Sequence, residues 1–347
     1  MQKKIFILVA TLTLLSAVFT GCNNTSQTTT RSDFALDTVV TITLYGTDDA
    51  SLLDAPFQKI YELADKLDAF SDTSEVTAIN NAAGVEPVAV SDETFEVIQK
   101  GIEYSYKTDG AFDITIGPLT ELWHIGSASD GKVPEQAAID AAKALVDYQK
   151  VTLDSTAKTV YLQESGMKLN LGAIAKGYIG DAVKAILLDE GVQNAVINLG
   201  GNVVLIGGRT HSQPFSVGVQ DPESEDGVNL GVIETTDQSI VTSGDYERYM
   251  TASDGTRYHH ILDPKTGYPA DSGLHQTTVL CDSSTDADAM STSFFIMGYD
   301  QVKEKLSDFG NPGVLFVTTD SHIEQLGNIR EVFTLNTEME KNYTFEE

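Results

Sequence analysis

Two hydrophobic patterns follow one another irregularly along the chain. Apolar residues at helical spacing predict helices over residues 52–70, 92–106, 135–148, 173–188 and 286–297, the fourth of them closed by Gly191. Short runs rich in β-branched residues predict strands over residues 38–45, 151–153, 160–162, 195–199, 203–206, 215–219, 231–234, 239–241, 258–262, 277–280, 314–317 and 323–325.

The order of these elements indicates the fold class. Strands and helices do not alternate one by one, and short turns join most neighbouring strands, which favours an α+β protein over a doubly wound one. We expect one compact domain over residues 33–340, with a mixed, largely antiparallel sheet and flanking helices. The sequence has no internal repeat and no proline-rich linker that would divide it.

The N-terminus predicts export. Lys3 and Lys4 precede an apolar run over residues 5–15 that is too short to span a bilayer, so residues 1–21 are expected to be a signal peptide. The run ends in AVFTGC, which resembles a bacterial lipoprotein signal with Cys22 as the acylated residue, although Phe19 replaces the usual leucine. Polar residues up to 32 would form a tether, so we expect an extracytoplasmic protein anchored to the membrane by lipid. An ordinary signal peptide with a chance cysteine is the alternative.

Composition narrows the function classes. The chain has 22 Lys and Arg against 51 Asp and Glu, a net charge of −29, which would repel nucleic acid. A phosphorylated ligand would need a metal ion or backbone dipoles to be held in such a field. Apart from Cys22 the only cysteine is Cys281, so no internal disulfide is expected.

Residues 169–178 (LNLGAIAKGY) place glycines and Lys176 where a strand gives way to a helix, which is a natural seat for an anion. The segment is not a Walker A loop, because Tyr178 and Ile179 stand where that motif needs lysine and Ser or Thr. Glycines at a helix entry can equally be structural.

A candidate cation site follows near the end of the chain. In residues 286–292 (DADAMST), Asp288 and Thr292 are four apart and share a helix face. One carboxylate and one hydroxyl suit Mg²⁺, which keeps waters and shares phosphate oxygens. The alternative is that Asp288 only favours the helix dipole. His259 and His260 would point to opposite faces of a strand, so at most one is catalytic, and no third His or Cys stands at zinc-ligand spacing.

These motifs together resemble the ApbE family, the FAD:protein FMN transferases, from about residue 34 to about residue 298. The matching segments are 34–38 (FALDT), 70–75 (FSDTSE), 110–119 (GAFDITIGPL) followed by Leu122 and Trp123, 169–178, 198–202 (NLGGN), 242–246 (TSGDY), 259–267 (HHILDPKTG) and 286–292. The resemblance implies Mg²⁺-dependent transfer of FMN from FAD to a threonine or serine hydroxyl of exported acceptor proteins, with release of AMP.

The resemblance also assigns residues. It implies flavin-dinucleotide binding by Leu36, Phe70, Ala111, Phe112, Asp113, Asn170, Lys176 and Leu262, and metal binding by the Ala173 carbonyl, Asp288 and Thr292. His260 is expected to be the catalytic base, with Asp245 as a second base or as the group that orients it. Two departures matter: Leu36-Asp37-Thr38 replaces the common Met-Gly-Thr, and Asn170 replaces an aspartate.

Two other functions stay open at this point. Water could replace the acceptor hydroxyl, which would make the protein an FAD hydrolase that yields FMN and AMP. The protein could also bind FAD without chemistry, as a scavenging lipoprotein. The chain has no Asp-x-x-Ser/Thr-Gly-Ala-Thr segment, the acceptor type that the resemblance implies, so self-modification is not expected.

Overall fold

The computed structural model describes residues 27–126, 129, 131–209, 213–224 and 227–345. The predicted signal peptide and Cys22 lie outside these residues. No helix within the described ranges has the length and apolar character needed to cross a membrane.

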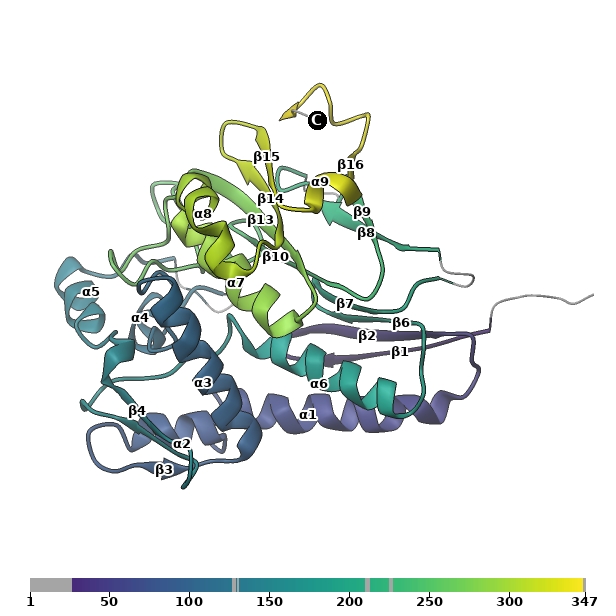
Figure 1. Ribbon diagram of the computed structural model, residues 1–347. Helices are drawn as coiled ribbons and strands as arrows, with labels where there is room; N and C mark the ends of the chain where they lie inside the picture. Colours follow the sequence, from purple (N-terminus) through teal and green to yellow (C-terminus); the bar gives the residue numbers. More distant parts are fainter. Residues whose placement is uncertain (1–26, 127–128, 130, 210–212, 225–226, 346–347) are drawn as a thin grey trace, which may run out of the picture.

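A nine-stranded sheet forms the centre of the molecule (Figure 1). Its order is β1-β2-β6-β7-β10-β13-β14-β15-β17, and every neighbouring pair is antiparallel except β15 with β17. The predicted α+β class with a mixed, largely antiparallel sheet is therefore confirmed. The strands are β1 (Thr28–Ala35), β2 (Thr38–Tyr45), β6 (Ala195–Leu199), β7 (Asn202–Ile206), β10 (Ser239–Gly244), β13 (Leu274–Cys281), β14 (Gly313–Thr318), β15 (His322–Leu326) and β17 (Thr344–Phe345).

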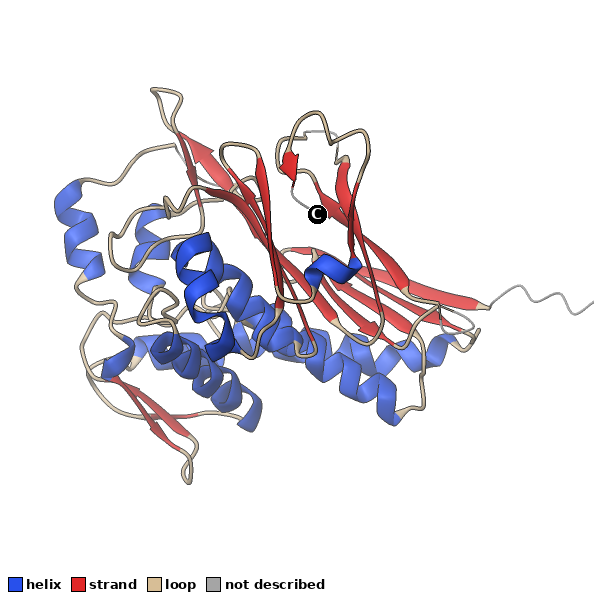
Figure 2. Ribbon diagram, turned by 45° about the horizontal axis from the view of Figure 1, so that its top comes forward, coloured by secondary structure: helices blue, strands red, loops and turns tan. Residues whose placement is uncertain are grey.

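Helices cover one face of this sheet, which we call the inner face (Figures 1 and 2). The covering helices α1 (Asp54–Leu67), α6 (Ala175–Asp189) and α7 (Ser284–Met297) lie against it. Alternation along β2 shows why: Val40, Ile42 and Leu44 are fully buried in the main core, whereas Val39 on the other face is 60% exposed.

A smaller sheet covers part of the outer face. It has the order β16-β9-β8, from β8 (Phe215–Gln220), β9 (Asn229–Thr235) and β16 (Phe333–Leu335). A second core lies between the two sheets and includes Leu205, Ile233 and Leu315, so the molecule has three layers here.

The remaining elements lie around these layers, with α9 (Ile329–Val332) packed in the second core. They are α2 (Glu75–Asn81), α3 (Asp92–Lys107), α4 (Gly117–Trp123), α5 (Gln136–Lys143), α8 (Tyr299–Lys305) and α9 (Ile329–Val332), the 3-10 turns η1 (Ala50–Leu53), η2 (Tyr148–Lys150) and η3 (Leu306–Phe309), the sheet of β3 (Val88–Ala89), β5 (Thr159–Leu162) and β4 (Val151–Asp154), and the pair β11 (Tyr249–Thr251) and β12 (Arg257–His259).

Some predicted boundaries were wrong. The tether expected over residues 22–32 overlaps β1, which pairs with β2 from Thr28 to Ala35, so the folded part begins earlier than predicted. Its polar side chains are used across the pair, since Ser32 Oγ lies 2.8 Å from Thr41 Oγ1. The strand expected over residues 258–262 ends at His259, and the helix expected over 135–148 ends at Lys143.

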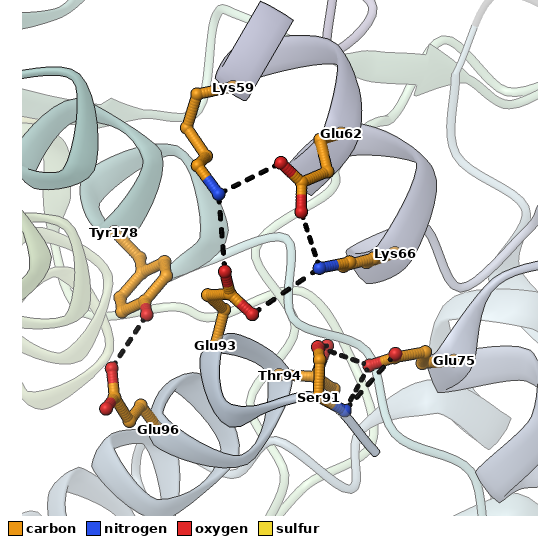
Figure 3. A network of polar contacts seen from close by, with 9 residues as sticks. All are labelled: Lys59, Glu62, Lys66, Glu75, Ser91, Glu93, Thr94, Glu96 and Tyr178. Atoms are coloured by element: carbon orange, nitrogen blue, oxygen red, sulfur yellow. Dashed lines mark hydrogen bonds and ion pairs between the residues drawn. The ribbon is translucent and has the colours of Figure 1, made fainter. Parts of the chain in front are cut away.

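Ion pairs link α1 to the start of α3 (Figure 3). Lys59 Nζ lies 2.9 Å from Glu62 and 3.2 Å from Glu93, while Lys66 Nζ lies 2.7 Å from Glu62 and 3.4 Å from Glu93. Hydrogen bonds from the lysines lower the pKa of Glu62. All four side chains keep contact with solvent, so each pair stabilises the fold by well under about 1 kcal/mol, and the network mainly sets how the helices lie.

Two glycines let α6 and α7 approach closely. A Cβ on Gly177 would lie 2.3 Å from the Ser284 carbonyl oxygen and 2.7 Å from Asp288 Cβ. A Cβ on Gly180 would lie 2.9 Å from Val204 Cγ2 and 3.0 Å from Ser284 Oγ. The sequence left open whether Gly177 binds an anion or is structural. Its close contacts with α7 show that helix packing requires a glycine at this position.

The Gly177→Ala substitution tests this packing. Its methyl group would meet backbone of α7, which cannot yield without shifting the helix, so we expect a loss of about 1–3 kcal/mol in the free energy of unfolding. Urea denaturation measures the loss. Gly126→Ala is the matched control, because nothing lies within 4 Å of its added Cβ. Equal stability of the two variants would contradict the close-packing argument.

Candidate active site

The site begins at the N-terminus of α7, which α6 holds in place. Asp181 of α6 accepts four hydrogen bonds: from the backbone N–H groups of Ser284 and Thr285, both at 2.9 Å, from Ser283 Oγ at 3.0 Å and from Thr285 Oγ1 at 2.7 Å. A carboxylate at a helix N-terminus pairs its free N–H groups and favours the helix dipole. Asp181 thus fixes the position of the helix that carries Asp288.

Asp288 lies one turn further along α7, 4% exposed. Its Oδ2 accepts the Gly177 N–H at 2.8 Å. Burial raises the pKa of Asp288, and Lys176 and the Gly177 hydrogen bond oppose that rise. Gly177 stands in the first turn of α6, where backbone N–H groups have no partner within the helix. Asp288 supplies that partner, and the Ala173 carbonyl as a metal ligand stays a prediction.

Thr292 completes the predicted ligand set on the same helix. Its Oγ1 lies 3.3 Å from Ser243 Oγ of β10, which also lies 2.8 Å from Ser291 Oγ. Within the described part of the chain, no group of three or more His, Cys, Asp or Glu side chains is arranged to hold a metal ion. The donors at hand are one carboxylate, one hydroxyl and one carbonyl, all hard oxygen atoms of the kind that fits Mg²⁺ rather than zinc.

His260 follows directly after β12. Its backbone N–H and its Nδ1 both lie near the Arg248 carbonyl oxygen, at 3.0 and 3.1 Å. A carbonyl only accepts, so Nδ1 carries the proton and Nε2 keeps its lone pair. Desolvation lowers the pKa of His260 to about 4, and the positive charges of Arg248 and Lys176 add to the effect. The imidazole is therefore neutral at neutral pH and can accept a proton.

His259, the last residue of β12, contacts different groups from His260. Its Nε2 lies 3.0 Å from the Ala270 carbonyl oxygen, and its ring meets Phe295 edge-on at 5.5 Å. Burial lowers its pKa. His259 is thus a packing residue beneath the loop that carries His260.

Asp245 pairs with another histidine. Its Oδ2 accepts from His275 Nδ1 at 2.7 Å, which raises the pKa of His275. In this structure the Arg248 carbonyl, and not Asp245, is the group bonded to the His260 ring. Asp245 as a second base or as the group that orients His260 stays a prediction.

Glu247 was missed by the sequence analysis. The surrounding protein desolvates its carboxyl group and raises its pKa, while Lys176 and Arg248 act in the opposite direction and Asp288 adds to the rise. Lys176 and Asp288 therefore lie close enough to Glu247 for their charges to act on its carboxyl group. The sequence indicated the nearby Asp245 but not Glu247, because a single Glu on a loop has no characteristic spacing to a partner residue.

The predicted flavin-binding residues differ in how far their side chains are available to bind a ligand. Leu36 and Asp37 form the two-residue turn between β1 and β2, with φ of +56° and +57°. Such turns favour glycine or asparagine, and left-handed backbone costs a leucine roughly 1–2 kcal/mol. The strained turn lies beside the Gly200 turn, since a Cβ on Gly200 would be 2.4 Å from Thr38 Oγ1.

Asn170 and Asp113 are already hydrogen-bonded within the protein. Asn170 Oδ1 accepts the Gly172 N–H at 2.9 Å and its Nδ2 donates to Thr120 Oγ1 at 3.2 Å. Asp113 accepts from the N–H and hydroxyl of Thr115 and from the Tyr148 N–H. Their side chains shape the loops, so contacts with a ligand would fall mainly to the backbone.

The other predicted positions range from the surface to the core. Phe70 is 66% exposed, which leaves its ring free for a planar ligand. Ala111, Phe112 and Leu262 are buried at 5%, 4% and 6% exposure. Lys176 stands in the first turn of α6.

Comparison with known proteins decides the family. The model of the ApbE family matches residues 36–315, most of the chain. This chain belongs to the ApbE family. It is 41% identical over 284 residues to an FAD:protein FMN transferase of Klebsiella pneumoniae, covering 82% of this chain and 87% of that one. It is 31% identical to the enzyme of that name from Treponema pallidum, covering 86% and 87%.

Solved structures of this family share the fold. The ApbE protein of Thermotoga maritima superposes with a TM-score of 0.81 at 34% identity, covering 88% of this chain and 99% of that one. The flavin transferase ApbE of Vibrio cholerae gives 0.76 at 26% identity, covering 92% and 100%. As an ApbE protein, this chain is an enzyme of the transferase class.

Substitution of the helix clamp tests how the site is held. Asp181→Asn keeps the size but loses the charge that two backbone N–H groups and two hydroxyls share, so we expect a loss of about 1.5–3 kcal/mol in the free energy of unfolding. Asp189→Asn, on the exposed end of the same helix, should change it by less than about 0.5 kcal/mol. Urea denaturation compares them; a stable Asp181→Asn protein would refute the clamp.

Proposed function

We propose that this protein transfers FMN from FAD to a threonine or serine hydroxyl of exported acceptor proteins and releases AMP, with Mg²⁺ as the metal. The observation that carries the proposal is the joint position of Lys176, Asp288 and neutral His260. They provide positive charge, a metal ligand and a proton acceptor at one end of the sheet. The names of the Klebsiella and Treponema relatives support the same reaction.

Charge neutralisation is the first requirement, since the net charge of −29 opposes a dianionic pyrophosphate. Mg²⁺ bound by Asp288, Thr292 and the Ala173 carbonyl would neutralise the phosphate oxygens. Lys176 adds a positive charge from the first turn of α6, whose helix dipole also favours an anion. Burial raises the pKa of Asp288, and a cation beside the carboxylate would favour its charged form.

The reaction itself needs only one proton acceptor. The acceptor hydroxyl oxygen attacks the phosphorus on the FMN side of FAD, a new O–P bond forms, and the P–O bond to AMP breaks. The hydroxyl proton passes to His260 Nε2, which the Arg248 carbonyl keeps as the free nitrogen. Glu247 lies near enough to Lys176 and Arg248 for their positive charges to lower its pKa against the larger effect of burial, which raises it.

The place of action follows from the N-terminal pattern. We propose that the mature protein begins at Cys22, carries lipid there, and works outside the cytoplasm on the membrane surface. The signal-peptide pattern of residues 1–21 supports this proposal. Metabolic labelling with a fatty acid analogue tests it: loss of label in Cys22→Ser is expected, and label retained in that variant would refute lipidation at this residue.

A transfer assay tests the proposed reaction. Protein, FAD and Mg²⁺ are incubated with a peptide that contains Asp-x-x-Thr-Gly-Ala-Thr, and mass spectrometry looks for the gain of one FMN. Asp288→Ala should reduce transfer at least 100-fold, because the charged metal ligand is lost. Asp286→Ala is the matched control, since Asp286 points away to Tyr104 and Lys100.

The outcomes separate the alternatives. FMN and AMP without an adduct on any acceptor would mean a hydrolase, and FAD bound intact would mean a binding protein. Full activity of Asp288→Ala in Mg²⁺ would refute the metal site. Equal loss in Asp286→Ala would mean that the helix, not the carboxylate, is responsible.

The pH dependence of kcat/KM tests His260, because this ratio reports groups of the free enzyme. Desolvation and the charges of Arg248, His259 and Lys176 lower its pKa to about 4, against the hydrogen bond to the Arg248 carbonyl, which raises it. The base form is then already present at pH 5.5, and kcat/KM should vary less than twofold between pH 5.5 and 7.5. His260→Gln should be at least 100-fold slower. A fall centred near pH 6.5 would contradict the low pKa.

A further inference from the structure

A groove runs along the outer face of the main sheet, beneath the edge of β8. Its volume is about 450 Å³, and its walls come from β2, β6, β7 and β10 on one side and from β8 on the other. Tyr45 and Phe215 meet across its far end with ring centroids 5.3 Å apart. Thr242 and Glu247 line its near end.

One wall of the groove is a strand edge. In the order β16-β9-β8, strand β8 pairs with β9 on one side, and no other strand of the described residues pairs with its second side. All six residues of β8 line the groove. A row of unpaired backbone groups beside a groove is the arrangement that binds an extended peptide by strand addition.

The groove reaches the active site at the end of the sheet. Successive residues of β10 face opposite sides, so Thr242 lines the groove while Ser243 contacts Thr292 on the inner side. Beyond the strand, Glu247 belongs to both the groove and the active site, because it lines the groove and interacts with Lys176 and Asp288. A segment in the groove can therefore place one residue at the reacting phosphorus.

FAD does not fit this groove by its chemistry. None of the eight predicted flavin-binding residues is among the residues that line it. Among the described residues that line it, only Arg209 and Glu247 have charged side chains, and their opposite charges offer a dianionic pyrophosphate no net positive charge. The mixture of amide, hydroxyl and apolar groups, such as Asn198, Ser216 and Val217, is instead that of a surface for a neutral peptide backbone.

We infer that this groove binds the acceptor protein, as an extended segment that adds to the edge of β8 and presents its target hydroxyl at the Glu247 end. The inference rests on the proposed flavin transfer and names the site of its second substrate. At about 3.3 Å per residue, the six residues of β8 match an acceptor segment of five or six residues.

A bulky side chain in the groove tests this inference. In Val217→Trp, an indole on the half-buried edge strand would occupy the groove. We expect KM for the Asp-x-x-Thr-Gly-Ala-Thr peptide to rise at least tenfold, with the Kd for FAD within twofold of the unchanged protein. Thr334→Trp is the matched control, because Thr334 is exposed on β16, the opposite edge of the same small sheet.

A photocrosslink covers the case in which Val217→Trp fails to fold. Benzoylphenylalanine placed at exposed Ser216 should crosslink to the peptide, and the same group at Thr334 should not. Unchanged peptide KM in folded Val217→Trp, loss of FAD binding in place of peptide binding, or equal crosslinking at both positions would overturn the inference. If the unsubstituted protein transfers FMN to no acceptor, the proposed function itself fails and the inference falls with it.

Discussion

The active site depends on the close approach of α6 and α7. Gly177 has no room for a side chain, and the space saved lets its N–H reach Asp288 at 2.8 Å. One turn further along α6, Asp181 holds the N-terminus of α7 with four hydrogen bonds. The two contacts fix both the axial position and the rotation of α7, because a helix held at two points on one face cannot turn. Asp288 and Thr292 are placed by this packing, to which Asp288 itself contributes through the hydrogen bond from Gly177.

The charges near the active site have to be considered separately from the net charge of the whole chain. A protein of net charge −29 repels phosphate at long range, yet counterions in solution screen that repulsion beyond about 8–10 Å. Near the site, burial shifts the pKa values of individual groups: it raises those of Asp288 and Glu247 and lowers that of His260. A cation beside Asp288 would oppose the effect of burial, because it favours the charged form of the carboxylate.

The sequence predicted features of the site that depend on residues close together in the chain. The four-residue spacing of Asp288 and Thr292 places them on one face of any helix, and the structure has that helix over Ser284–Met297. Asp181 was not predicted, since nothing in α6 indicates that its carboxylate reaches the start of a helix about 100 residues later. Glu247 was missed for the same reason. The polar β1 was assigned to the tether because its partner, β2, supplies the apolar residues that a strand signal needs, and β1 itself has few.

In the arrangement we propose, the alternation of side chains along β10 would keep the two substrates apart. In β10, Thr242 faces the groove and Ser243 faces α7, so this strand forms a wall of both the groove and the active site. FAD and an extended acceptor could then approach from opposite faces of the sheet and meet only at its end, where Glu247 lies. Because side chains along a strand have a period of two, a shift of one residue in the pairing of β10 would exchange the two surfaces. The pairing of β10 with β13 from Ser239 to Gly244 holds that register along the whole strand, so the division between the substrates is as secure as the sheet itself.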